Sequence, residues 1–406
     1  MDELTLNPRA ELVRDLDDAG SLRALTLIAP RRGVPLRTTT VARDEGAVFE
    51  VLRDVAAGAG VELDLDACAW QRLVDIGFLL RPDEVPDDVP FTCPIGDAAP
   101  YRGPRDALRV NPALRLDGRV GAPVEAWVDV PSAGRERDGG RGARRVNAYA
   151  DERAWATVVH AHLPTPTAFS LDANDRALLA RLTPGGAVPA DLDDDSVGRL
   201  LDAGLVEDRA AAERASTAWE AARAAAVEDF ARDRCASLAG LLHPRMVDAL
   251  RARYRALVAE GYAGFDEALG RNRFCMHNEP VARVIHRALA PLVSSVAGEA
   301  VKPSYVYLGG YREGAVLVPH RDRDQCPISV SLLVDYEPTP SSQWPLRVEL
   351  PRPGGPAVFE AYQSPGDGVF FDGTKLIHHR PSLPAGHRST SLFFHYVPAR
   401  FEGGLD

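Results

Sequence analysis

The sequence predicts an α+β protein in which two winged-helix-like α+β repeats precede a C-terminal double-stranded β-helix (jelly-roll) barrel with supporting helices. Three observations lead to this prediction. A chain of 406 residues is long enough for two or three domains. Two sequence marks recur in the same order in the first half, and short strands dominate after residue 302. We place the domains at 1–105, 106–215 and 216–406.

The repeated marks lie far apart in the chain. The segment 6–12 (LNPRAEL) is echoed by 110–116 (VNPALRL), and 72–79 (RLVDIGFL) is echoed by 199–206 (RLLDAGLV). A helical apolar run precedes the second mark in each copy, and its glycine suits the position that follows a helix. Short strands, a helix, a second helix and a final strand are the order of a winged helix. The polar, glycine-rich stretch 131–145 is predicted to be a mobile loop in the second copy.

The second half changes from helices to strands. An alanine-rich helical stretch begins near Ala215, and two clearer helices open at Pro244 and Pro280, because proline suits the first turn of a helix. Five later segments have the composition of strands. They are 305–308, 328–333, 346–350, 368–371 and 391–397. Helices beside an all-β segment of this size favour a jelly-roll barrel.

Charge and composition exclude several classes of protein. The net charge is −11 and the pI is about 5.5, which argues against nucleic acid as a partner. Residues Met1 to Leu4 carry no targeting signal, and no apolar stretch approaches the ~18 residues of a membrane helix. We therefore expect a cytoplasmic protein without a membrane partner. The five cysteines form no Cys-x-x-Cys, so neither a disulfide framework nor a thiolate zinc site is expected.

A group of polar residues in the strand-rich part has the composition of a metal site. His320-Arg321-Asp322 is followed by His378 and, ten residues later, by Arg388. In an extended segment residues i and i+2 point the same way, so His320 and Asp322 are expected on one face. Two imidazoles and one carboxylate on one face are the ligands of non-haem Fe(II), and they leave positions open for a co-substrate and O2.

In their order these residues resemble the Fe(II)/2-oxoglutarate-dependent dioxygenases, specifically the prolyl-hydroxylase-like branch. The matching pieces are 311–314, 320–322, the strand 329–334, 366–371, and 378 with 386–390. The resemblance implies that His320, Asp322 and His378 ligate Fe(II) and form the catalytic centre. It also implies that Arg388 pairs with the distal carboxylate of 2-oxoglutarate, a role that suits a planar guanidinium. O2 would be the second co-substrate, and hydroxylation of an unactivated carbon is the implied default reaction.

Several neighbouring residues are candidates for further roles. The alternatives to two of the ligands are Asp324 for Asp322 and His379 for His378, and the spacing in the family favours Asp322 and His378. Thr390 shares a strand face with Arg388 and is a second candidate for the carboxylate. Tyr305 and Tyr307 are candidates for the pocket wall. The candidates for substrate contact are Arg380, Arg323, Gln325 and Trp344. The competing interpretation is a barrel whose histidines are ordinary residues and bind no metal.

The front half has three interpretations. DNA binding is disfavoured, because the candidate second helices carry the acidic stretches 64–66 and 191–195, which would repel phosphate. The order of elements loosely resembles the precursor-peptide-recognition domains of ribosomal peptide natural-product pathways. Those are winged-helix folds that accept a peptide as an added strand. The third interpretation is a scaffolding surface or a homodimer interface.

The predicted function is hydroxylation of an amino-acid residue in a peptide that the N-terminal repeats recruit, with Fe(II), 2-oxoglutarate and O2. Two attached repeats would supply affinity that the active site itself need not provide. Hydroxylation of a free amino acid or another small metabolite is the alternative within the same class. From another class, the alternative is a non-catalytic 2-oxoglutarate-binding scaffold or regulatory protein.

Overall fold

The computed structural model describes most of the chain. The described residues are 5–7, 10–16, 21–31, 34–56, 65–81, 84, 91–117, 155–259, 263–266, 272–338, 343–403 and 405. Those before residue 90 belong to one compact unit, and those of 91–117 and 155–403 form a second. The predicted loop at 131–145 lies outside the described residues. None of the described helices combines the length and the apolar composition needed to cross a membrane.

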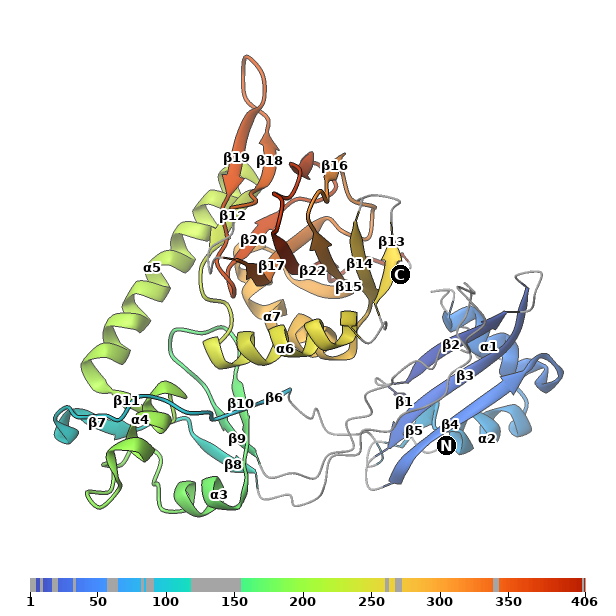
Figure 1. The fold of residues 1–406 in the computed structure, drawn as a ribbon. Helices are drawn as coiled ribbons and strands as arrows, with labels where there is room; N and C mark the ends of the chain where they lie inside the picture. The colour runs from blue at the N-terminus through green and yellow to red at the C-terminus, as the bar shows by residue number, and fades with distance from the viewer. Residues whose placement is uncertain are drawn as a thin grey trace. The chain divides into compact units, whose positions relative to one another are not determined.

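The first unit contains a three-stranded sheet, two helices and a two-stranded ribbon (Figure 1). Its elements are β1 (Thr5–Leu6), β2 (Glu11–Leu16), β3 (Leu22–Arg31), β4 (Val34–Ala42), α1 (Ala47–Ala56), α2 (Ala67–Asp75) and β5 (Leu79–Leu80). The antiparallel sheet has the order β2-β3-β4, and β1 pairs with β5. Leu25 and Leu27 of β3 pack with Leu52 of α1 and Leu73 of α2 in one buried core.

After its first strand, the second unit repeats this sequence of elements. They are β7 (Leu108–Val110), β8 (Arg115–Asp117), β9 (Trp155–Val158), β10 (Thr167–Ser170), α3 (Ala173–Leu179), α4 (Asp194–Asp202) and β11 (Val206–Asp208). The strands β8, β9 and β10 pair antiparallel in chain order, and β7 pairs with β11. Each of these pairings has its counterpart in the first unit, so the two stretches of chain share one arrangement of strands.

The repeated sequence marks contact each other within each copy. Asn7 donates a side-chain hydrogen bond to the Gly77 carbonyl at 2.9 Å, and Asn111 donates to the Gly204 carbonyl at 3.2 Å. Gly77 and Gly204 have φ of 80° and 67°, in the left-handed region that favours glycine after a helix. The marks therefore recur because each asparagine holds the end of the second helix. The assignment of this arrangement to the winged-helix class stays a prediction.

One strand departs from the predicted boundary after residue 105. The strand β6 (Thr92–Pro94) precedes that boundary, yet it pairs in parallel with β10 of the second unit. Cys93 and Ile95 are buried in the core of the second repeat. This apolar burial fixes the segment on the second repeat, and no local sequence signal identifies so short a strand or its distant partner.

The rest of the second unit contains helices and two antiparallel sheets. The elements are α5 (Arg209–Asp233), β12 (Cys235–Leu238), α6 (Pro244–Ala259), β13 (Gly264–Asp266), β14 (Arg273–His277), α7 (Pro280–Ala297), β15 (Val301–Arg312), β16 (Leu317–His320), β17 (Ile328–Glu337), β18 (Leu346–Leu350), β19 (Ala357–Ala361), β20 (Gly368–Phe371), β21 (His378–Arg380) and β22 (Arg388–Pro398). The helices predicted at Pro244 and Pro280 and the five predicted strands are confirmed. The larger sheet has the order β12-β20-β17-β22-β15-β14-β13, and the smaller one β16-β21-β18-β19.

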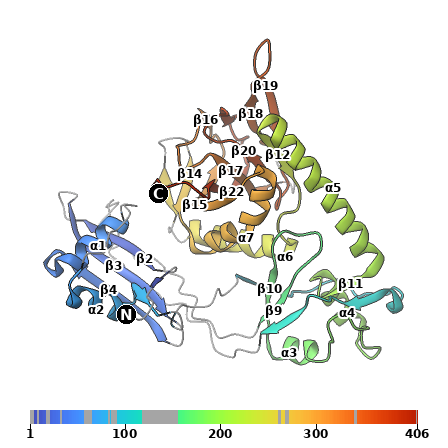
Figure 2. The same cartoon turned by 180° about the vertical axis from the view of Figure 1, so that it is seen from behind.

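The two sheets share a core, and helices cover the larger one. Val369 and Phe371 of β20 pack with Leu346 and Val348 of β18. The helix α7 packs on β15 and β22, and α6 packs on β17. Both views show α5 extending along the side of the second unit, from the repeat to β12 (Figures 1 and 2). The jelly-roll barrel was predicted; the structure shows these two packed sheets.

Candidate active site

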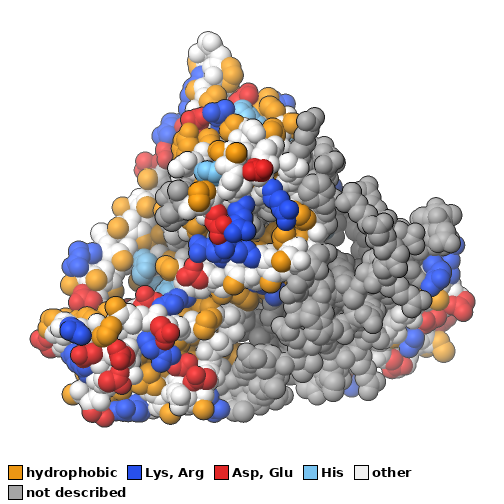
Figure 3. All heavy atoms as spheres, in the orientation of Figure 1, with side chains coloured by type: hydrophobic (Ala, Val, Ile, Leu, Met, Phe, Trp, Pro, Cys, Tyr) orange, Lys and Arg blue, Asp and Glu red, His pale blue; other side chains and the backbone are white. Residues whose placement is uncertain are grey.

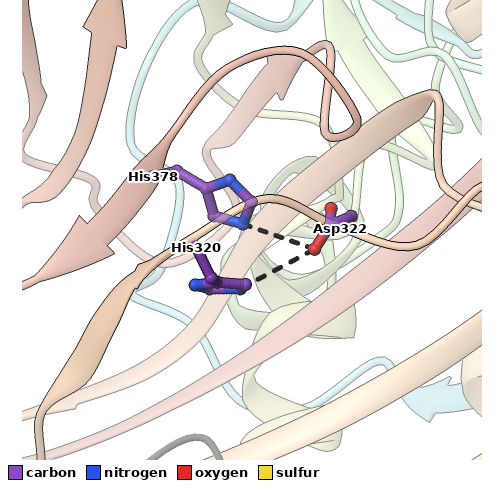
Figure 4. A group of neighbouring side chains, drawn as sticks. All are labelled: His320, Asp322 and His378. Atoms are coloured by element: carbon purple, nitrogen blue, oxygen red, sulfur yellow. Dashed lines mark ion pairs between the residues drawn. The ribbon is translucent and has the colours of Figure 1, made fainter.

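The predicted metal ligands come together where β16 and β21 pair. His320 ends β16 and lies opposite His378, the first residue of β21, in the antiparallel ladder. Asp322 follows β16 and points its carboxylate at both rings (Figure 4). Its Oδ1 lies 3.7 Å from His320 Nε2 and 3.4 Å from His378 Nε2. The three ligand atoms lie within 4.8 Å of one another.

Hydrogen bonds set the orientation of both histidine rings. His320 Nδ1 lies 2.8 Å from the Val318 carbonyl, and His378 Nδ1 lies 3.2 Å from the Leu376 carbonyl. A carbonyl only accepts, so Nδ1 carries the proton in each ring and Nε2 keeps its lone pair. Burial lowers the pKa of His320, which keeps that ring neutral. Both Nε2 atoms are therefore ready to bind a cation.

A series of hydrogen bonds fixes Asp322 on the side away from the two histidines. Its own N–H donates to the Gly373 carbonyl, and Ser329 Oγ donates to Oδ2 at 2.8 Å. Ser329 Oγ also lies 2.9 Å from His395 Nδ1. Burial would raise the pKa of Asp322, but the close imidazoles of His378 and His395 and the hydrogen bond from Ser329 outweigh it and lower the pKa. The carboxylate is therefore ionised at neutral pH.

Gly373 is required for this arrangement. A Cβ at this position would overlap the Asp322 carboxylate and the Ser329 hydroxyl. The close approach of backbone and carboxylate is therefore possible only without a side chain.

The ligands lie in the wall of a cavity of about 470 Å³. Its lining residues are Arg273, Tyr305, Tyr307, Tyr311, Leu317, His320, Arg321, Asp322, Arg323, Leu346, Phe371, His378, Phe393 and His395. The structure thus places Tyr305, Tyr307 and Arg323 where the sequence predicted pocket residues. Arg323 donates to the Tyr305 hydroxyl at 2.9 Å. Asp322 is the only carboxylate among these lining residues.

Arg380 is a buried cation beside this cavity. It follows His378 by two residues on β21, and only 1% of its surface is exposed. Its guanidinium donates to the Trp344 carbonyl at 2.9 Å and to Gln363 Oε1 at 3.1 Å, both neutral acceptors. Burial lowers the pKa of Arg380 to about 10. Among the described residues no carboxylate pairs with it, and its Nε has no hydrogen-bond partner.

Other polar groups in the same interior also lack partners. The Oγ atoms of Ser389 and Ser391 are buried without a hydrogen bond. Ser389 lies opposite Tyr311 of β15. Burial raises the pKa of Tyr311, and the nearby positive charges of Arg273 and Arg380 oppose that rise. Buried hydroxyl groups without partners lie here beside a guanidinium that has no carboxylate partner among the described residues. Such a group of donors is suited to bind an anion.

Arg388 is not part of this interior, which corrects the sequence prediction for the carboxylate. Its side chain is 58% exposed and forms an ion pair with Glu337. Arg255 also forms an ion pair with Glu337. Figure 3 shows that basic and acidic side chains lie next to each other on the described part of the face drawn there. His395 and Phe393 of β22 line the cavity, so alternation turns Arg388 and Thr390 to the opposite face. Thr390 is partly exposed and does not line the cavity either.

The remaining candidates divide by position. Trp344 is fully buried and packs on Tyr311, so its role in the structure is packing and support of Arg380. Gln325 does not line the cavity. His379 lies opposite Arg347 on the other strand face, and Asp324 is exposed. Of the alternatives that the sequence left for these two ligands, His378 and Asp322 are therefore the residues that lie together with His320.

Sequence reasoning missed three residues around the ligands: Ser329, His395 and Arg273. Ser329 and His395 pair across β17 and β22. Ser329 lies in the strand 329–334, which already belongs to the motif. That position is a weak signal in the sequence for a role beside the ligands. Arg273 is brought in by β14, which has no motif of its own.

Comparison with known proteins gives partial likenesses. No protein-family model and no curated protein matches the chain. A Pseudomonas putida prolyl-4-hydroxylase structure is 23% identical, with a TM-score of 0.37, over 43% of this chain and 98% of that one. The epimerase SnoN from nogalamycin biosynthesis, in complex with Fe3+, alpha ketoglutarate and nogalamycin RO, is 15% identical, with a TM-score of 0.39, over 44% and 85%. HygX from Streptomyces hygroscopicus, with nickel and 2-oxoglutarate bound, is 13% identical, with a TM-score of 0.36, over 44% and 87%.

Proposed function

We propose that this chain is an Fe(II)- and 2-oxoglutarate-dependent oxygenase that hydroxylates an unactivated carbon. The observation that carries the proposal is the convergence of His320 Nε2, His378 Nε2 and Asp322 Oδ1 in the wall of a cavity. Neutral imidazoles and an ionised carboxylate are the donor set that non-haem Fe(II) takes, with other coordination positions left open. When bound, iron with 2-oxoglutarate and O2 converts a C–H bond to C–OH and yields succinate and CO2.

In this proposal the chain's own residues set the geometry of the ligands. The carbonyls of Val318 and Leu376 fix the two rings, and Ser329 holds the outer oxygen of Asp322. Such supporting hydrogen bonds orient metal ligands and fix their tautomers. The apolar and aromatic lining limits water around the reacting carbon.

Arg380 is our proposed partner for the distal carboxylate of 2-oxoglutarate, in place of Arg388. A buried guanidinium with neutral acceptors alone is left uncompensated, and a carboxylate would both neutralise it and accept from its Nε. The hydroxyls of Ser389 and Tyr311 are further donors in this interior. The alternation that turns His378 inward also turns Arg380 inward.

For the substrate we propose an amino-acid residue within a peptide that the N-terminal repeats recruit. The support is the complete duplication of a small domain that contributes no residue to the cavity described above. Recruitment by attached modules raises the effective concentration of a substrate without any change in the active site.

An anaerobic titration with Fe(II) and 2-oxoglutarate tests the oxygenase proposal, followed by the metal-to-ligand charge-transfer absorption of the ternary complex. Wild type and His379→Ala are expected to develop the band, because His379 lies on the other strand face. Asp322→Ala and His378→Ala are expected to lose it. A folded wild-type protein without the band would overturn the proposal, and so would a band that needs His379 and not His378.

A further inference from the structure

Beside the proposed metal ligands, a cysteine and a tyrosine from separate parts of the chain are in contact. Cys326 lies in the loop between β16 and β17, and Tyr305 lies on β15. The Tyr305 hydroxyl is 3.0 Å from Cys326 Sγ. Cys326 is fully buried, and only 5% of the Tyr305 surface is exposed. The two side chains are therefore held together away from bulk solvent.

This thiol lies next to the proposed metal centre. The Sγ atom of Cys326, a carboxylate oxygen of Asp322 and a ring nitrogen of His395 lie within 4.8 Å of one another. Asp322 is one of the three proposed ligands, and Tyr305 lines the cavity in whose wall those ligands lie. An oxidant that forms in this cavity therefore meets the phenol in the wall, and the thiol is in contact with that phenol.

The Tyr305 ring is held in position on several sides. Arg323 donates to its hydroxyl at 2.9 Å, and the Arg323 guanidinium lies 5.1 Å from the centre of the ring. The rings of His277 and His395 lie 5.1 and 4.6 Å from the Tyr305 ring. These contacts keep the phenol beside the sulfur, and two reacting groups that are held in contact react far faster than groups that must first meet.

A thiol and a phenol in contact can be joined by oxidation. The cysteine sulfur forms a bond to a tyrosine ring carbon adjacent to the carbon that bears the hydroxyl. The S–H bond and one ring C–H bond break, and two protons and two electrons leave. The phenol hydroxyl directs the new bond to this ring carbon, because it donates electron density there. A sulfur that already touches the hydroxyl oxygen needs only a small shift to reach this carbon.

The co-substrates of the proposed oxygenase reaction supply the oxidant. O2 accepts four electrons in this step. Two of them come from 2-oxoglutarate, which becomes succinate and CO2, and two come from the thiol and the phenol. One oxygen atom enters succinate, and the other leaves as water with the two hydrogen atoms. No oxygen enters the protein, and the step takes the place of substrate hydroxylation when the cavity holds no substrate.

We propose that Cys326 and Tyr305 become joined by a thioether bond, a covalent modification that the protein carries out on itself. The proposal rests on the proposed oxygenase function, which supplies the oxidant. The bond connects β15 of the larger sheet to the loop that carries Asp322. A cross-link between residues 21 positions apart removes conformational freedom from the unfolded chain, so it also stabilises the fold around this ligand.

Peptide mapping of the full-length protein by mass spectrometry tests the proposal. Protein produced without O2 is loaded with Fe(II) and 2-oxoglutarate, exposed to O2 without substrate, reduced and digested with trypsin. Trypsin places Tyr305 in peptide 288–312 and Cys326 in peptide 324–347. After exposure to O2 we expect one linked species, lighter than the sum of both peptides by two hydrogen atoms. A disulfide cannot produce this species, because 288–312 contains no cysteine.

Variants identify the groups that the reaction needs. Cys326→Ser and Tyr305→Phe are expected to yield only the separate peptides. Asp322→Ala is expected to do the same, because the oxidant forms only with the metal ligands in place. Cys235→Ala, at another buried cysteine, is the matched control and is expected to form the linked species as wild type does. The melting temperature is expected to rise on exposure to O2 in wild type and to stay unchanged in Cys326→Ser.

The charge-transfer absorption of the same anaerobic samples separates the two proposals. A wild-type sample that shows the band and forms succinate, yet yields only separate peptides, would overturn the thioether and leave the oxygenase proposal in place. Oxygen added to Cys326 or Tyr305 instead of the link would also overturn the thioether, since sulfur oxidation is the competing reaction of a cysteine. A folded wild type without the band would overturn both proposals.

Discussion

Ser329 Oγ donates a hydrogen bond of 2.8 Å to Asp322 Oδ2, the carboxylate oxygen that does not face the two histidines. The hydroxyl thereby fixes the rotation of the carboxylate, so that Oδ1 stays directed at both Nε2 atoms. Ser329 acts on the proposed metal only through Asp322, as a positioning residue.

Replacement of Ser329 by alanine is expected to weaken Fe(II) binding by about 10- to 100-fold, the range typical of lost hydrogen bonds behind metal ligands. Fluorescence-monitored anaerobic titration measures the dissociation constant. Ser329→Thr keeps the hydroxyl and is expected to bind iron nearly as wild type does. Equal affinities for wild type and the alanine variant would show that the carboxylate does not need this support.

Replacement of Arg380 is expected to abolish the stabilisation that 2-oxoglutarate provides. A ligand that binds the folded state raises the melting temperature with its concentration. In the presence of Mn(II), wild type and Arg388→Gln are expected to show this rise, and Arg380→Gln to lose it. The matched pair distinguishes the buried guanidinium from the exposed one. Loss of the rise in Arg388→Gln alone would return the carboxylate to the position that the sequence motif predicts.

Buried histidines are expected to make the fold acid-sensitive. His160 and His243 stack at 5.0 Å, and burial lowers their pKa to about 3 and about 4. Each ring is neutral in the folded protein and gains a proton on unfolding below the ordinary pKa of 6.5. Their contribution to stability is thus complete above pH 6.5 and declines as the pH falls toward 4. Each group changes the free energy of unfolding by up to ~1.4 kcal/mol per pH unit.

Urea unfolding at pH 7, 6 and 5 measures this slope. His160→Phe is expected to reduce this slope, because phenylalanine takes up no proton on unfolding. The variant is expected to fold, because phenylalanine keeps a ring at this position and His160 Nε2 makes no hydrogen bond that would be lost. His162→Phe, at a partly exposed neighbouring ring, is the control. An unchanged slope in His160→Phe would contradict the assignment.

Two glycines with the same backbone angle are expected to differ in their tolerance of alanine. Gly204 and Gly240 have φ of 67° and 66°. A Cβ at Gly240 meets open space, whereas one at Gly204 would overlap the ring of His160. Gly240→Ala is expected to cost about 1 kcal/mol from the left-handed backbone alone. Gly204→Ala is expected to cost about 2 kcal/mol more, because a packed ring must move. Equal losses in denaturant unfolding would show that the ring adjusts freely.

The sequence predicted those parts of the structure that leave a local pattern. The ligands His320 and Asp322 are two residues apart on an extended segment, so alternation alone places them together. The repeated marks also carry their own explanation, since Asn7 and Asn111 each bond to the glycine of the second mark. Strand composition located every predicted strand of the larger and smaller sheets.

The sequence predictions were wrong where tertiary packing decides which way a side chain points or which strand it lies beside. The ten-residue spacing after His378 predicts that Arg388 binds the carboxylate of 2-oxoglutarate. In the structure His395 and Phe393 of β22, which belong to no motif, face the cavity, so Arg388 points to the opposite side of the strand. Arg380 was assigned to substrate contact because nothing in the sequence reveals that its guanidinium is buried. The three residues of β6 carry no signal for a partner 75 residues away.

That separation has a consequence for synthesis of the chain on the ribosome. Residues 92–101 leave the ribosome before β10 has been translated, since Cys93 and its acceptor Ala168 are 75 residues apart. At 5–20 residues per second the delay is about 4 to 15 s. The first repeat is already complete during this interval. Cys93 and Ile95 therefore stay unburied until β10 has been translated, because their core belongs to the second repeat.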